Sequence, residues 1–298
     1  MAHGTGDSRR GATGAAALVA PIALLLAGCL GLGADPAHRP EPRPALDAYR
    51  LVEARARSSA GCRYDYRVFE PLGAPASAVI LGHGFLRDQD REVGLARALA
   101  NAGHRAVTLD FCNMRPWNGH HARNAIDMRE LARVHGLPGA TLYAGFSAGA
   151  LAALLAGADD PGAIGVVALD LVDQGRLGLE AAGRLDAPLV GLAGPPAACN
   201  AGGNGLEVFD ARPTGADEAA ARRVVDLVPE ATHCDFELPT DWLCELACGE
   251  SPPLTDALAG RATTRRALVV ERTVELVDSL VEGAARTEPA RARSPSPR

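Results

Sequence analysis

Short apolar runs with the composition of β-strands alternate with amphipathic or apolar runs of helical length along most of this chain. Such an alternation is typical of βαβ units, so it predicts an α/β fold with a mainly parallel central sheet flanked by helices. The strands are expected at 63–70, 77–84, 105–110, 141–145, 163–170, 187–194 and 224–230. Helices are expected at 90–102, 122–135, 148–156 and 263–281.

The amino terminus has the three parts of an export signal. "SRR" ends at Arg10, the apolar run "ALVAPIALLLAG" begins at Ala17, and "LAGC" ends at Cys29. The apolar run is shorter than the roughly 20 residues that cross a bilayer, which argues against a retained transmembrane helix. "LAGC" resembles the lipobox of bacterial lipoproteins, which implies lipidation of Cys29 and a signal peptide over 1–28. A plain secretory signal followed by an incidental cysteine is the alternative.

The segments that flank the expected strands are rich in proline and arginine. They predict a lipid-anchored tether over 29–60 and a disordered tail over 285–298. The region between them, 61–284, has the length of one α/β domain. We expect it to be a monomer held at a membrane in the cell envelope.

The charged residues exclude several functions. The chain has 30 basic and 36 acidic residues and no long basic run, so nothing in it favours binding to nucleic acid. Every basic residue is arginine, which excludes Schiff-base, pyridoxal-phosphate and P-loop chemistry that depends on lysine. We expect no cofactor and no catalytic metal.

Six cysteines follow Cys29, an even number in a chain that we expect to be exported: Cys62, Cys112, Cys199, Cys234, Cys244 and Cys248. Export predicts disulfide bonds between them. The sequence favours only the pair Cys62 and Cys112, which lie before and after expected strands. A zinc site is the competing hypothesis, with the ligands His233, Cys234, Cys244 and Cys248.

Ser147 is the candidate nucleophile. It lies in "AGFSAG", where glycines two residues before and after a serine arise by chance about one time in ten. Its context is more specific, because an expected strand ends just before it and an expected helix begins at Ala148, as in the nucleophile elbow of a serine hydrolase. His233 follows the last expected strand and is the candidate base. Asp170, at the end of the strand expected at 163–170, is the candidate acid, and Asp173, three residues later, is the alternative.

Other polar groups could complete such a site. The backbone amides of Phe85 and Ala148 are the expected donors to an oxyanion. The side chain of His83 is expected to shape the loop that carries Phe85. His120 and His121 could line the site, but the sequence favours a solvated loop pair. Asp235 and Glu237 could tune the environment of His233, and ordinary loop solvation explains them equally well. Asn200 and Asn204 are expected in a flexible rim, with substrate contact as the alternative.

Four motifs carry a family resemblance. "VILGHGF", "AGFSAG", "ALDLVDQG" and "THCDFE", in this order, resemble α/β-hydrolases of the chlorophyllase-like and dienelactone-hydrolase-like group. The resemblance covers about 68–281. It implies an α/β-hydrolase fold and a serine hydrolase in which Ser147 is the nucleophile, Asp170 the acid and His233 the base.

The expected function is hydrolysis of a small-molecule ester through an acyl-enzyme. The alternatives are an acyltransferase, which differs only in the acceptor, and a catalytically inactive surface lipoprotein that uses the fold for binding. The interval between Asp173 and Ala187 is too short for a large cap domain, which predicts an open site.

Overall fold

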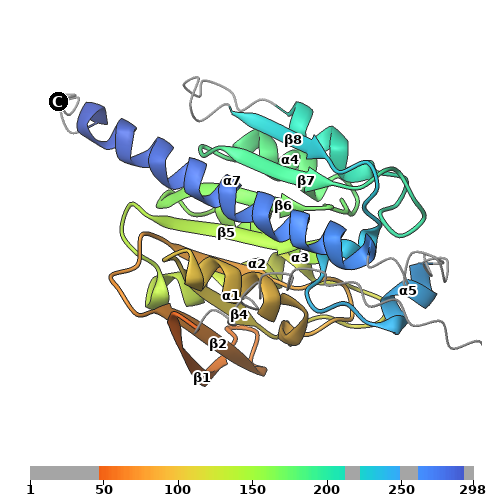
Figure 1. The fold of residues 1–298 in the computed structure, drawn as a ribbon, viewed down its shortest axis with the longest axis horizontal. Coiled ribbons are helices and arrows are strands. Elements are labelled where there is room, and N and C mark those ends of the chain that lie inside the picture. The colour runs from red at the N-terminus through yellow and green to blue at the C-terminus, as the bar shows by residue number, and fades with distance from the viewer. Residues whose placement is uncertain (1–46, 212–221, 249–260, 292–298) are drawn as a thin grey trace, which may run out of the picture. The chain divides into compact units, whose positions relative to one another are not determined.

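Eight strands form one sheet in the order β1-β2-β4-β3-β5-β6-β7-β8 (Figure 1). β2 pairs antiparallel with β1 and with β4, and all other neighbours are parallel. A computed structural model describes residues 47–211, 222–248 and 261–291 of the 298. The strands are β1 Tyr49–Arg57, β2 Arg63–Pro71, β3 Ala78–Gly82, β4 Arg105–Leu109, β5 Thr141–Phe146, β6 Ala163–Leu169, β7 Leu189–Ala193 and β8 Arg223–Leu227.

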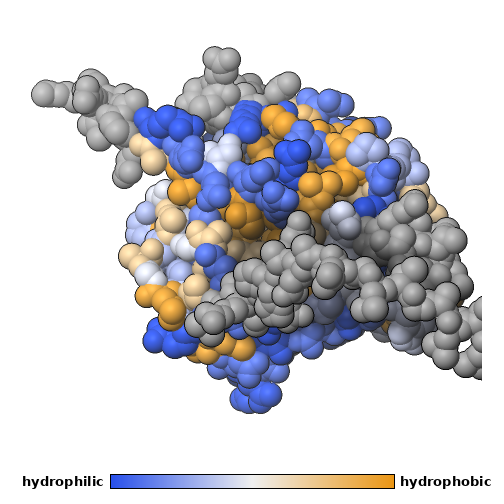
Figure 2. All heavy atoms as spheres, in the orientation of Figure 1, coloured by the Kyte–Doolittle hydropathy of each residue, from blue (hydrophilic) through white to orange (hydrophobic). Residues whose placement is uncertain are grey.

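Helices cover both faces of the sheet, as the alternating pattern predicted. The α-helices are α1 Val93–Asn101, α2 His121–His135, α3 Ala148–Ala158, α4 Leu177–Arg184, α5 Trp242–Cys248 and α7 Arg261–Arg291. α1 and α7 pack on one face with the buried side chains Leu99, Val277 and Leu280. α2, α3 and α4 pack on the other face with Met128 and Leu154. In Figure 2, hydrophobic residues lie among hydrophilic ones on the face that α7 covers.

The middle of the sheet is the most hydrophobic part of the fold. Every residue of β3 and β5 is buried, because both strands have helices on both of their faces. α3 follows β5 and is almost entirely apolar, so it is buried on nearly all sides. Because parallel strands of this kind end at the same edge of the sheet, the residues after β3, β5, β6 and β7 are brought together there.

Two expected boundaries were wrong. β1 lies inside the segment 29–60 that was expected to be a tether, because its backbone pairs with β2 along its whole length. This edge strand is mostly exposed and alternates charged residues with alanine, so its sequence lacks the apolar pattern of a buried strand. At the other end, α7 continues to Arg291, into the segment 285–298 that was expected to be disordered.

The structure does not test the amino-terminal predictions. The signal peptide 1–28, Cys29 and the first part of the tether lie outside the described residues. Within the described ranges, no helix combines the length and the apolarity that a membrane span needs.

Candidate active site

Ser147 occupies a sharp turn between β5 and α3. Its backbone has φ 55° and ψ −116°, a strained conformation for a residue with a side chain. The turn is tight because β3, β5 and the first turn of α3 approach closely: a Cβ atom on Gly145 would lie 2.5 Å from the backbone carbonyl of Gly149. A glycine is therefore required at that position, and the turn directs the Ser147 side chain to the carboxyl edge of the sheet.

The structure brings Ser147, His233 and Asp170 together. Nε2 of His233 lies 3.1 Å from Oγ of Ser147, and Nδ1 of His233 lies 2.6 Å from Oδ2 of Asp170. All three side chains are buried. The His233 ring also lies against the ring of Phe146, with centroids 4.6 Å apart. In this geometry the imidazole can remove the serine proton while the carboxylate orients the ring and stabilises its positive charge.

Asp170 is held by donors from the next loop. Oδ1 of Asp170 accepts a hydrogen bond from the amide of Gly194 at 3.0 Å, and Nδ2 of Asn200 lies 3.3 and 3.4 Å from the two carboxylate oxygens. Asn200 also donates to the carbonyl of Pro195, and its own oxygen accepts from the amides of Ala197 and Gly203. The expectation that Asn200 lies in a flexible rim was therefore wrong, because its side chain is buried and fully used.

The alternative acid, Asp173, points elsewhere. Its carboxylate accepts hydrogen bonds from the amides of Gly178 at 2.7 Å and Leu179 at 3.2 Å, where α4 begins. Asn204 bonds to the backbone of Asp173 through both its oxygen and its nitrogen. These contacts make Asp173 a capping residue of α4, and Asn204 stabilises the backbone of the same loop.

The two expected oxyanion donors lie directly after β3 and β5, which are neighbouring parallel strands of the sheet. Ala148 is the first residue of α3, and Phe85 lies in the loop that follows β3. One amide beside each of them is occupied, since the amide of Ser147 donates to the carbonyl of Leu169 and the amide of Leu86 donates to the sulfur of Met114. The amides of Phe85 and Ala148 have no hydrogen-bond partner in the described part of the chain.

His83 is a structural residue of the loop after β3. Its Nδ1 bonds to the carbonyl of Gly84 at 2.8 Å, and its Nε2 accepts from the amide of Phe111 at 2.9 Å. Burial lowers the pKa of His83, so the ring stays neutral with its proton on Nδ1. This arrangement agrees with the expectation that His83 shapes the loop.

His121 differs from its predicted exposure. It is the first residue of α2, it is buried, and its ring lies near the backbone of Ala148 and the side chain of Gln174. Burial lowers its pKa, and its Nδ1 has no hydrogen-bond partner among the described residues. The sequence did not indicate that His121 is buried, because it follows an irregular loop and the exposure of such a residue depends on which other segments pack on it.

Asp235 and Glu237, beside the candidate base, are fully buried rather than solvated. Asp235 accepts hydrogen bonds from Arg265 at 2.6 Å and Arg266 at 3.1 Å, both at the start of α7. Glu237 pairs with Arg87. Ion pairs from two distant segments thus hold the short 3-10 helix His233–Phe236 that carries the base.

The six cysteines form three disulfides: Cys62–Cys112, Cys199–Cys248 and Cys234–Cys244. The first is the pair that the sequence favoured. The sulfur atoms of Cys234, Cys244 and Cys248 lie within 4.8 Å of one another, as a metal site would need. Because each of them is bonded in a disulfide, and His233 is engaged with Ser147 and Asp170, the zinc hypothesis is not supported.

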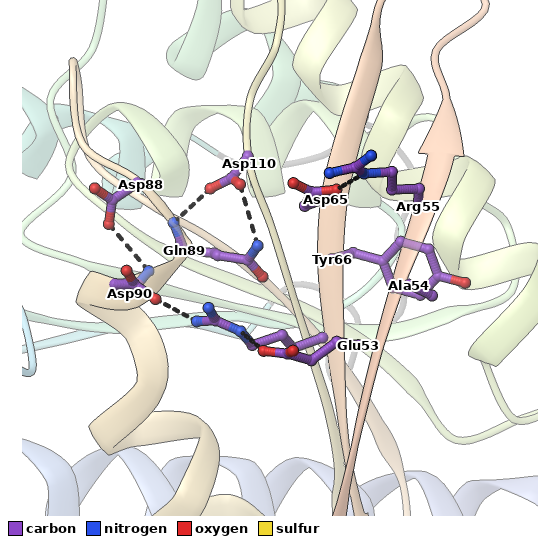
Figure 3. A pocket seen from close by; sticks show the side chains of 10 residues that line it. Glu53, Ala54, Arg55, Asp65, Tyr66, Asp88, Gln89, Asp90 and Asp110 are labelled. Carbon is purple, nitrogen blue, oxygen red and sulfur yellow. Dashed lines mark hydrogen bonds and ion pairs between the residues drawn. The ribbon is translucent and has the colours of Figure 1, made fainter.

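A separate hollow of about 440 Å³ lies between the β1–β2 hairpin and the loops after β3 and β4 (Figure 3). Asp65, Asp88, Asp90 and Asp110 line it, and Asp110 bonds to both the amide and the side chain of Gln89. Ser147, Asp170 and His233 do not line this hollow. The hollow is therefore separate from the candidate active site.

Comparison with known proteins supports the fold. No family model and no curated protein sequence matches the chain. Among solved structures, a Pseudomonas aeruginosa hypothetical protein has a TM-score of 0.52 and 13% identity, covering 75% of this chain and 96% of its own. A Klebsiella pneumoniae protein assigned as a dienelactone hydrolase has a TM-score of 0.50 and 20% identity, covering 68% and 100%. An acetyl xylan esterase from Paenibacillus sp. R4 has a TM-score of 0.50 and 14% identity, covering 65% and 81%. The sheet, its helices and these likenesses show that the chain has the α/β-hydrolase fold.

Proposed function

We propose that this protein is a serine hydrolase that cleaves carboxylic ester bonds of small molecules through an acyl-enzyme. The observation that carries the proposal is the hydrogen-bonded series Ser147, His233 and Asp170 at a strained strand-to-helix turn. A structural serine would have no need of a positive φ angle, so the strained turn between β5 and α3 favours Ser147 as a nucleophile.

The proposed reaction has two halves. In the first, His233 takes the proton of Ser147 as Oγ attacks the ester carbonyl, and the amides of Phe85 and Ala148 bind the oxyanion that forms. His233 then gives that proton to the departing alcohol, and the acyl group stays on Ser147. In the second half, His233 takes a proton from water, which attacks the acyl-enzyme, and the proton returns to Ser147 as the acid is released.

Labelling by a fluorophosphonate probe tests this proposal, because only an activated serine displaces fluoride from the phosphorus. We expect covalent labelling of the purified protein, with the modified peptide containing Ser147, and hydrolysis of p-nitrophenyl esters of varied acyl length. Absence of both labelling and hydrolysis would contradict the enzymatic proposal and favour a binding role for the fold.

We also propose that the protein is exported and lipid-anchored through Cys29. The "LAGC" motif supports the anchor, and three disulfides are typical of chains that fold in an oxidising compartment. We expect mass spectrometry of protein isolated from cells to find an acylated Cys29 at the amino terminus and no free thiol among the other six cysteines. An unmodified Cys29 would contradict the anchor, and six free thiols would contradict export.

A further inference from the structure

Arg87 links the two loops that we propose to bind the oxyanion and to carry the base. We call residues 83–88, after β3, the donor loop, and residues 228–241, after β8, the histidine loop. Nε of Arg87 donates to Oε1 of Glu237 at 2.6 Å, and Nη2 donates to Oε2 at 2.9 Å. Nη2 also donates to Oδ1 of Asp241 at 2.8 Å. The guanidinium therefore holds the histidine loop at two points.

This contact is buried. The Arg87 side chain is 12% exposed and the Glu237 side chain 0%. Among the described residues, Arg87 is the one cation that pairs with Glu237, while Arg91 binds the other oxygen of Asp241 at 2.9 Å. Paired planar groups with two parallel hydrogen bonds restrict both distance and orientation, which a single ionic contact does not.

Within the described ranges, Glu237 has no second charged partner of opposite sign. Glu92 is buried nearby, and neither of its carboxyl oxygens has a hydrogen-bond partner in the described part of the chain. Burial, with a smaller contribution from the charge of Glu237, raises the pKa of Glu92 well above its usual range. Burial thus disfavours a second charged carboxylate beside Glu237, and Arg87 is the described cation that compensates the charge of Glu237.

Each loop is otherwise fixed to a different part of the fold. The donor loop is anchored toward β4 by the bonds of His83 to Phe111 and of Leu86 to Met114. The histidine loop is anchored toward α5 by the Cys234–Cys244 disulfide and toward α7 by the ion pairs of Asp235. The backbone of Leu238 bonds to Arg91 and Gly94, which lie beyond the donor loop. Arg87 is therefore the side chain by which the donor loop itself contacts the histidine loop.

We propose that Arg87 is a positioning residue, whose paired hydrogen bonds to Glu237 set the spacing between the amide of Phe85 and the imidazole of His233. This inference rests on the proposed function, because both groups must meet at one substrate carbonyl. Phe85 precedes Arg87 by two residues, and Glu237 follows His233 by four, so a shift of the ion pair moves both groups. A misplacement of about 1 Å in such a site can lower the rate about 100-fold.

The test compares two arginines that make the same kind of contact. Arg87→Met removes the paired hydrogen bonds to Glu237. Arg87→Met combined with Glu237→Gln removes them without leaving the buried charge of Glu237 unpaired. Arg105→Met is the matched control, because Arg105 binds Glu70 in the same two-point manner, at 2.6 and 2.9 Å, at the start of β4 and away from Ser147. Rates of ester hydrolysis, rates of fluorophosphonate labelling and melting temperatures are measured for each.

We expect both Arg87 variants to lower kcat about 10- to 100-fold with KM within about threefold of wild type, and to slow labelling to a similar degree. Arg105→Met should lower the melting temperature comparably and keep kcat within about twofold. Arg87→Lys retains the charge but not the planar guanidinium with its two parallel donors, so its kcat should lie between those of wild type and Arg87→Met.

The inference is overturned if the wild type is active and the double variant keeps wild-type kcat. It is also overturned if kcat falls in Arg105→Met as much as in the Arg87 variants, since the loss would then follow stability alone. A wild-type protein that neither hydrolyses esters nor reacts with the probe would overturn the proposed function, and this inference with it.

Discussion

Replacing Ser147 by alanine should lower kcat for ester hydrolysis by at least about 10⁴-fold, since loss of the nucleophile leaves only binding and the oxyanion donors to accelerate the reaction. The same variant should show no covalent labelling by a fluorophosphonate. The variant should fold, because the change removes only the hydroxyl that lies 3.1 Å from Nε2 of His233, and the strained turn is held by the close contacts of Gly145 and Gly149. Initial rates with a p-nitrophenyl ester, on protein of matched melting temperature, measure the effect.

Ser77 provides a matched control for Ser147. Its hydroxyl lies 2.9 Å from Nδ1 of His104, whose Nε2 lies 3.0 Å from Asp278, so this group has the same three residue types. It lies at the opposite edge of the sheet, before β3 and β4, and Ser77 is fully buried. Ser77→Ala should therefore cost some stability and leave kcat within about twofold of wild type. Equal rates in wild type and Ser147→Ala would exclude Ser147 as the nucleophile.

The sequence predicts those parts of the candidate site that depend on local patterns and on chain order. Ser147 could be selected because an apolar strand, a tight turn and an apolar helix are local features, and local features are recorded in consecutive residues. Asp170 was predicted as the acid by elimination, since the loop after β7 has no carboxylate before Glu207. The chain order and the parallel sheet then placed both of them at one edge with His233.

Features that depend on distant contacts were missed for a physical reason. Arg87 and Glu237 are 150 positions apart, so nothing in either segment indicates that the other neutralises it. β1 was assigned to the tether because its stability comes from backbone pairing with β2, and its side chains carry little hydrophobic pattern. Asn200 was placed in a mobile rim because its glycine-rich neighbours indicate a turn but not its burial.

Replacing Asp170 by asparagine should lower kcat by about 10⁴-fold while changing the shape of the site very little. The reason lies in the donors around the carboxylate. Oδ1 accepts from the amide of Gly194, so an asparagine would place its oxygen there and its NH₂ group at the position of Oδ2, 2.6 Å from Nδ1 of His233. That NH₂ group donates to Nδ1 and thereby keeps the imidazole proton on Nε2. An imidazole in that tautomer cannot take the proton of Ser147.

Asp173→Asn is the control that decides between the two acids. Asp173 accepts from the amides of Gly178 and Leu179 at the start of α4, and an asparagine there retains one acceptor, so we expect a loss of about 0.5 kcal/mol in the free energy of unfolding and a kcat within about threefold of wild type. Steady-state kinetics and denaturant unfolding of both variants give the comparison. If Asp173→Asn lost the activity and Asp170→Asn kept it, the acid would be Asp173, and the contact of Asp170 with His233 would have only a structural role. Because the two residues are three positions apart on one loop, this exchange tests the geometry of the site and not its composition.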